Sequence, residues 1–354
     1  AAAALAASQL RGRRRAAAAA FCRGAAGRGA LVACRAEEGP SSFALGQLAD
    51  TLRAAVESEA RGDSVEDLQR VEAKAREVVT TMSGFSGFGT VEQAEKKAWN
   101  VIDLKEAGIE FQSLLELDDS AAAARRGVLT AVVLGGLVLI LLLNPPALAV
   151  NLLGGGIIAG ALVDNLVNSG AFQSLVAESI ASSINAEYGN RVVQHEAARF
   201  LVGYLIGVLP KAYSLSTTEA LDNYESTRIK PGCAFCAAEF DLELKAGKVT
   251  SKTIDQFLCI NLAGIVQEYT MFGKAQSGAP NLTSVEDLLR AVGLSPQAQQ
   301  EITRWAVYNV AGLLKRHKDI HAELAAAMSK GAPAEECIAL IERRLPLADA
   351  AAAA

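Results

Sequence analysis

The residues most capable of chemistry in this chain read His195-Glu196-Ala197-Ala198-Arg199. In the motif HExxH, two histidines four residues apart lie on one helix face and bind zinc, and the glutamate after the first activates a water molecule. His195 stands in the position of the first zinc ligand, and Glu196 in that of the general base. Arg199 replaces the second ligand, and a permanently charged guanidinium has no lone pair for a metal. The segment predicts a metallopeptidase helix that lacks its second ligand.

Few other side chains offer metal ligands. His317 and His321 have the i, i+4 spacing that chelates metals. Cationic neighbours oppose metal binding there and favour a solvated basic helix face: Lys315, Arg316 and Lys318. Three further carboxylates are candidates whose positions the sequence does not determine: Asp222, Glu225 and Glu268.

Cys233 and Cys236 form a CxxC pair, which suits half of a zinc site, a redox pair, or two small apolar residues at the start of a strand. No second CxxC follows, and we expect the last of these. The six cysteines are too sparse for a disulfide scaffold and fit a reducing compartment. From Phe235 to Leu244 acidic residues alternate with apolar ones, which predicts a half-exposed strand with Glu239, Asp241 and Glu243 on its solvated face.

The elements that would position these residues are mainly helices. Residues 171–345 form the predicted C-terminal domain. Apolar spacing there predicts helices over Gln173 to Ala186, Arg191 to Leu209, Ile254 to Met271, Val285 to Val292, Gln297 to Met328 and Ala334 to Leu345. We expect residues 346–354 to form a disordered tail.

A polar segment, residues 37–124, is predicted to form a helical soluble arm. Leu45, Leu48, Leu52 and Val56 recur at helical spacing, as do Val65, Leu68, Val71 and Ala75 after Asp63-Ser64. The glycines between Gly84 and Gly89 interrupt the helices, and Leu104 to Gly108 suggests a short helix that ends at its glycine.

Residues 125–168 are predicted to enter a membrane. No charged residue occurs in 127–163, and Pro145-Pro146 divides this run into two apolar halves. Each half is near the lower limit of about 17 residues for a membrane helix. We expect a hairpin, with a single span or a buried helix pair as alternatives. Arg125 and Arg126 place the preceding side on the positive, stromal or matrix, face.

Residues 1–36 are rich in arginine and alanine and contain no acidic residue. This composition is typical of an organelle transit peptide, and Val32 to Ala36 suggests a plastid processing site. A mitochondrial transit peptide and a low-complexity tail are the alternatives.

Two segments together resemble the peptidase domain of FtsH-type ATP-dependent zinc metalloproteases. The first is 195–199, and the second is Leu262-Ala263-Gly264-Ile265-Val266-Gln267-Glu268-Tyr269 with Phe272-Gly273. A plant and algal plastid group of FtsH-like proteins without the ATPase domain is a closer match. Its likeness extends to Leu201–Lys211, Trp305–Val307, Leu313–His317, Ala327–Gly331 and Leu104–Ile109.

The resemblance implies a third zinc ligand, an aspartate, in the segment matched by Ser277 to Leu282. Leu282 falls where that aspartate would be. With Arg199 at the second position, two of three ligands are missing. Such a site is expected to hold no zinc, and Glu196 is expected to be vestigial. Arg199 lies one helical turn from His195 and is expected to neutralise Glu196. No Walker A motif occurs in the chain, so we expect no ATP site.

The expected fold is mainly α: a helical arm, a membrane hairpin, and a mostly helical peptidase-like domain with a short β element. The expected function is that of a non-catalytic plastid membrane protein, in the thylakoid or inner envelope, with the peptidase-like domain in the stroma. Its partners would be the lipid bilayer and membrane protein complexes or proteases. The net charge of −5 gives no reason to expect nucleic acid. The alternatives are an active zinc endopeptidase with non-standard ligands and a purely structural membrane-hairpin subunit.

Overall fold

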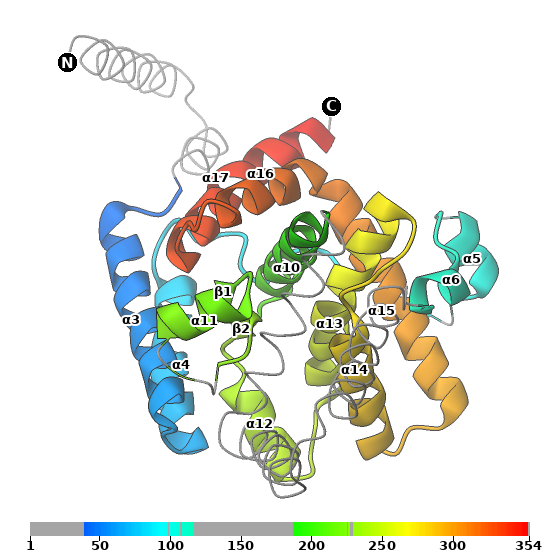
Figure 1. Cartoon of the computed structure of the whole chain (residues 1–354), viewed down its shortest axis with the longest axis horizontal. Helices are drawn as coiled ribbons and strands as arrows, with labels where there is room; N and C mark the ends of the chain where they lie inside the picture. The colour runs from blue at the N-terminus through cyan, green and yellow to red at the C-terminus, as the bar shows by residue number, and fades with distance from the viewer. Residues whose placement is uncertain are drawn as a thin grey trace, which may run out of the picture.

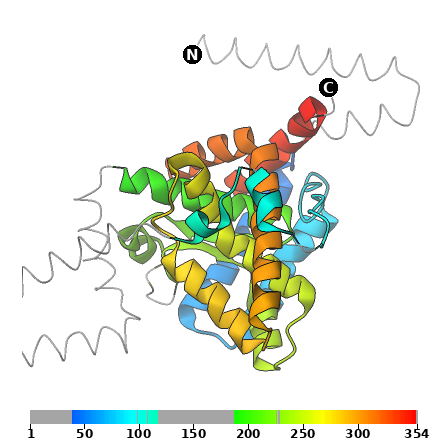
Figure 2. The same ribbon diagram turned by 90° about the vertical axis from the view of Figure 1, so that its right-hand side faces the viewer.

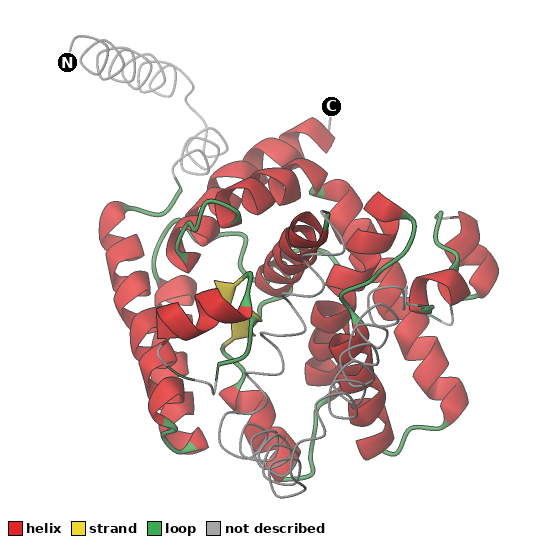
Figure 3. Cartoon of the chain, viewed as in Figure 1, coloured by secondary structure: helices red, strands yellow, loops and turns green. Residues whose placement is uncertain are grey.

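The computed structural model describes residues 39–116 and 187–352, except residues 98, 107, 225, 227 and 228. Within these residues the protein is mainly helical, with one small antiparallel sheet of two strands (Figure 3). The mainly helical fold class with a short β element is therefore confirmed for the described part of the chain. The predicted transit peptide, the membrane segment 125–168 and the helix Gln173 to Ala186 lie outside the described residues.

The arm begins with two long helices, as the apolar spacing predicts. Helix α3 (Ser42–Arg61) starts where the Ser41 side chain accepts the N–H of Ala44, and ends at Gly62, whose φ is 76°. Helix α4 (Val65–Thr81) packs against α3, and Ser64 caps its start. Two short helices follow, α5 (Val101–Glu106) and α6 (Phe111–Leu115). Figure 2 shows them against the C-terminal half of the protein.

The second half is built around two packed helices, α10 (Tyr188–Leu205) and α13 (Ser251–Phe272), which lie near the centre in Figure 1. Strand β1 (Pro210–Ser214) pairs with β2 (Gly232–Phe235), with Tyr213 opposite Cys233. The remaining helices surround this centre: α11 (Thr217–Tyr224), α12 (Ala238–Lys245), α14 (Ala279–Ala291), α15 (Pro296–Arg316), α16 (Lys318–Met328) and α17 (Ala334–Ala352).

The predicted strand from Phe235 to Leu244 is wrong beyond its first residue. Strand β2 ends at Phe235, and the acidic segment forms helix α12. Strand β1 begins at Pro210, which lies opposite Phe235, so a longer β2 would have no partner strand. The residues of α12 are mostly good helix formers, and Phe240 stacks on Phe257 of α13 with ring centroids 5.0 Å apart.

Three helix boundaries also differ from the sequence pattern. The predicted helix Arg191 to Leu209 ends at Leu205, because Gly207 adopts a φ of 88°. The pattern from Gln297 to Met328 is two helices, α15 and α16, which meet at His317. Helix α17 continues to Ala352, through most of the segment predicted as a tail.

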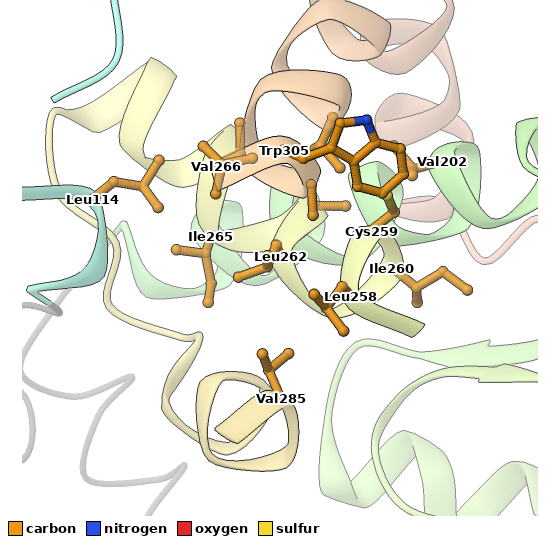
Figure 4. Close-up of a cluster of buried hydrophobic side chains, with 14 of the residues drawn as sticks. Leu114, Val202, Leu258, Cys259, Ile260, Leu262, Ile265, Val266, Val285 and Trp305 are labelled. Atoms are coloured by element: carbon orange, nitrogen blue, oxygen red, sulfur yellow. The ribbon is translucent and has the colours of Figure 1, made fainter. Parts of the chain in front are cut away.

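The arm and the C-terminal half share their apolar cores. One core joins Trp99, Leu104 and Leu114 of the arm to side chains of α10, α13 and α15, several of which are drawn in Figure 4. The other joins Leu48 and Leu52 of α3 to α10, α16 and α17. The described arm is therefore packed into the same body as the described C-terminal half.

Two buried polar contacts reinforce this packing. Lys211 of β1, 4% exposed, binds Glu72 of α4 at 2.6 Å and Glu59 of α3 at 2.8 Å. Glu342 of α17 accepts the Gly87 N–H at 2.9 Å and the Tyr204 hydroxyl at 2.5 Å. Each contact joins the arm to an element more than a hundred residues later.

Among the helices that the structure describes, none combines the length and the apolar character needed to cross a bilayer.

Candidate functional site

The centre of the candidate site is the imidazole of His195, which α10 presents to α13. Glu268 of α13 lies with a carboxylate oxygen 2.6 Å from Nδ1 of His195, and the amide nitrogen of Asn281 in α14 lies 3.1 Å from Nε2. His195 is 2% exposed and Glu268 is completely buried. Gly264 makes room for the ring, because a Cβ there would lie 2.3 Å from its Nε2 atom.

The partners of His195 determine its tautomer. The amide nitrogen of Asn281 can only donate, and it also approaches the Asn261 carbonyl at 3.4 Å, which fixes the orientation of the amide. Nε2 of His195 therefore accepts, and Nδ1 carries the proton that is donated to Glu268. His195 is then a neutral imidazole, and the lone pair of its Nε2 atom accepts the Asn281 amide N–H.

Glu196, the expected general base, is held by three groups. Its carboxylate accepts the Arg199 guanidinium at 2.9 Å and the backbone N–H of Cys233 at 2.7 Å. The thiol of Cys233 donates to the backbone carbonyl of Glu196 at 3.2 Å. The expectation that Arg199 reaches and neutralises Glu196 is confirmed by this geometry.

Both carboxylates at the site are stabilised as anions despite their burial. Burial by itself would raise the pKa of Glu196, but Arg199 and the Cys233 amide hold that pKa below its usual value. Burial would likewise raise the pKa of Glu268. The bonds from His195 and from the backbone N–H groups of Gln276 and Ser277 hold it below its usual value instead.

These residues do not fit the zinc ion that the resemblance implies. A catalytic zinc needs three protein ligands and an open position. Here Nε2 of His195 accepts an amide N–H, and the second-ligand position carries a guanidinium paired with Glu196. The side chain that reaches His195 from the third-ligand segment is Asn281, not Leu282, which packs at the edge of an apolar core. The residues form two hydrogen-bonded groups, His195 with Glu268 and Asn281, and Glu196 with Arg199 and Cys233.

Sequence reasoning brought together His195, Glu196 and Arg199 but missed two partners. The sequence makes Glu268 one of three candidate carboxylates whose positions it does not determine, and it gives Asn281 no role beside Leu282. They lie 73 and 86 residues from His195. The available signal was the glutamate in the segment Leu262 to Tyr269, within the resemblance. Asp222 is exposed on α11, and Glu225 is outside the described residues.

The two other histidines and the CxxC cysteines, which are also candidate metal ligands, are buried in the fold. The prediction that His317 and His321 form a solvated face is wrong, because they are only 4% and 3% exposed. His321 Nε2 donates to the Gln194 carbonyl at 3.1 Å, and its Nδ1 accepts from Gln267 at 3.3 Å. Burial lowers the pKa of His321, an effect that the Gln194 carbonyl opposes. Cys233 and Cys236 are buried free thiols, and burial raises the pKa of Cys236 to about 12.

Comparisons of this chain with protein-family models, with curated proteins and with solved structures find no match. The likeness to FtsH-type peptidases therefore depends on the quoted motif residues.

Proposed function

We propose that this chain is a plastid membrane protein whose FtsH-peptidase-like domain, residues 171–345, acts by binding and not by catalysis. Its role would be that of a scaffold or partner in membrane-protein quality control or complex assembly. The transit-like segment 1–36 and the uncharged run 127–163 support the location.

The observation that carries the non-catalytic part is that both groups that chemistry would need already have partners. The lone pair of His195 Nε2 accepts the Asn281 amide, and the Glu196 carboxylate is paired with Arg199. A general base must be able to reach a water or substrate proton, and a zinc ligand must offer a lone pair. Here the Nε2 lone pair of His195 already accepts an amide N–H, and the guanidinium of Arg199 balances the charge of Glu196.

The test uses the purified full chain beside its Glu196→Gln and His195→Ala variants. We expect no stoichiometric zinc by elemental analysis, and no hydrolysis of unfolded casein that Glu196→Gln abolishes. Circular dichroism of each variant controls for folding. Near-stoichiometric zinc that is lost in His195→Ala, or hydrolysis that is lost in Glu196→Gln, would establish the zinc endopeptidase alternative.

The location and the binding role need separate measurements. A fluorescent protein fused after residue 36 should enter plastids, and mitochondrial import would contradict the location. In chemical crosslinking of isolated plastid membranes, crosslinks to membrane-complex or protease subunits should persist in Glu196→Gln and disappear when 171–345 is deleted. Crosslinks that survive this deletion but not that of 127–163 would indicate the structural-hairpin alternative.

A further inference from the structure

A cavity of about 900 Å³ lies where the arm meets α12, α13 and β2. Arm residues Phe88, Gly89 and Gln93 form one wall, and Phe235, Phe240 and Phe257 belong to the other. A volume of this size is typical of binding pockets for small molecules and peptide segments. Arg199 also lines this space, so the cavity adjoins the Glu196–Arg199 ion pair.

Strand β2 lies between β1 and α10 at this wall of the cavity. The N–H of Cys236 donates to Leu209 of the neighbouring strand region, whereas the N–H of Cys233 donates to Glu196 on the opposite side. Backbone groups alternate in direction along a strand, so the N–H and C=O of Phe235 point to the same side as those of Cys233. In the described part of the chain β2 pairs only with β1, and helix α10 lies on the other side of β2.

The mouth of the cavity is acidic on the α12 side. Glu239, Asp241 and Glu243 line it within one short helix. Glu239 pairs with Arg76 at 2.5 Å. Asp241 and Glu243 form no ion pair with a described residue, and Glu243 accepts the backbone N–H of Thr250 at 2.9 Å. Lys252 is the cation in the lining that likewise has no such ion pair among the described residues, so the unpaired charge at the mouth is negative on balance.

We propose that this cavity binds an extended peptide segment with apolar side chains on either side of a lysine or arginine. The apolar side chains would contact the phenylalanines, and the cation would face Asp241 and Glu243. This inference rests on the proposed function, because a peptide held beside a catalytically inert pair is bound and not cut. It gives the binding role a defined recognition chemistry.

The test measures fluorescence anisotropy of two labelled nonapeptides with the purified full chain in lipid nanodiscs, which exclude competing detergent. Both peptides contain leucine and phenylalanine residues, and they differ only in a central lysine or glutamate. We expect the lysine peptide to bind roughly tenfold more tightly than the glutamate peptide. Phe240→Ala should weaken both peptides roughly tenfold, because it removes part of the apolar wall.

Charge reversal makes the test specific. Asp241→Lys should weaken the lysine peptide and strengthen the glutamate peptide, each roughly two- to fivefold. Asp50→Lys is the matched control, because Asp50 is also exposed but lies on α3 outside the cavity lining. It should change neither affinity.

Equal binding of the two peptides, unchanged by Asp241→Lys, would overturn the proposed charge preference. Absence of binding, or binding unaffected by Phe240→Ala, would overturn the site itself. These failures are distinct from failure of the proposed function, which shows itself in zinc content and Glu196-dependent hydrolysis.

Discussion

Replacing Arg199 and Asn281 with metal ligands should convert the residues around His195 into a zinc site. Two donor atoms of a tetrahedral zinc site, each about 2.0–2.1 Å from the metal, lie about 3.3 Å apart. The amide nitrogen of Asn281 and Nε2 of His195 are 3.1 Å apart. A carboxylate oxygen at position 281 therefore needs a displacement of only a few tenths of an ångström.

The double variant Arg199→His/Asn281→Asp supplies His195, a second imidazole one helical turn later, and a carboxylate. Zinc replaces the positive charge that Glu196 loses with Arg199. We expect about one zinc per chain after dialysis against zinc and removal of excess metal, measured by elemental analysis. At free zinc a thousandfold above its Kd, the free energy of unfolding should rise by about 4 kcal/mol.

The control is Arg199→His/Leu282→Asp, which places the carboxylate at the residue that motif alignment indicates. It should bind little zinc, because Leu282 packs at an apolar core and Asn281 remains on Nε2 of His195. Zinc in this control and none in the Asn281 variant would refute the assignment of Asn281 to the third-ligand place. No zinc in either variant would refute the geometric argument.

Further predictions concern stability. Lys211→Met should lower the free energy of unfolding by about 3–5 kcal/mol, because it leaves Glu72 buried without its cation, and adding Glu72→Gln should recover most of this loss in urea titrations. Gly264→Ala should cost about 1–3 kcal/mol through contact with the His195 ring, whereas Gly312→Ala, with open space around it, should stabilise its helix by about 0.5–1 kcal/mol; equal effects on the melting temperature would contradict this. Since the folded-state pKa of His321 lies below 6.5, the unfolded chain binds its proton first, and the free energy of unfolding should fall as pH drops below 6.5. His321→Gln should show a smaller fall, and an unchanged pH profile would count against the explanation.

The helices of the arm could be predicted because their apolar residues repeat with the helical period. Leu48, Leu52 and Ala75 are all buried as that spacing requires. Helix α12 could not be predicted in this way. Over its eight residues the alternation of acidic and apolar side chains favours a strand, whereas the residue types favour a helix. The outcome depends on where strand β1 begins. Tertiary context decided this element.

Only the contacts of the candidate site between residues close in sequence could be predicted. The i, i+3 pairing of Glu196 with Arg199 follows from helix geometry and was expected. The contacts of His195 with Glu268 and Asn281 join three helices, so they depend on packing that sequence spacing does not contain. The burial of His321 has the same origin, since its neighbours in sequence are charged while its neighbours in space are Gln194 and Gln267.

The bond between Gly87 and Glu342 has a consequence for how the protein is made. The two residues are 255 positions apart. During synthesis the glycine-rich loop of the arm leaves the ribosome long before α17, so its buried amide has no carboxylate partner until α17 arrives. Contacts of such long sequence separation form late and slowly, because a large loop must close first. Completion of the arm is thereby coupled to the synthesis of α17, and a product that stops before α17 would expose an unfinished arm to proteases.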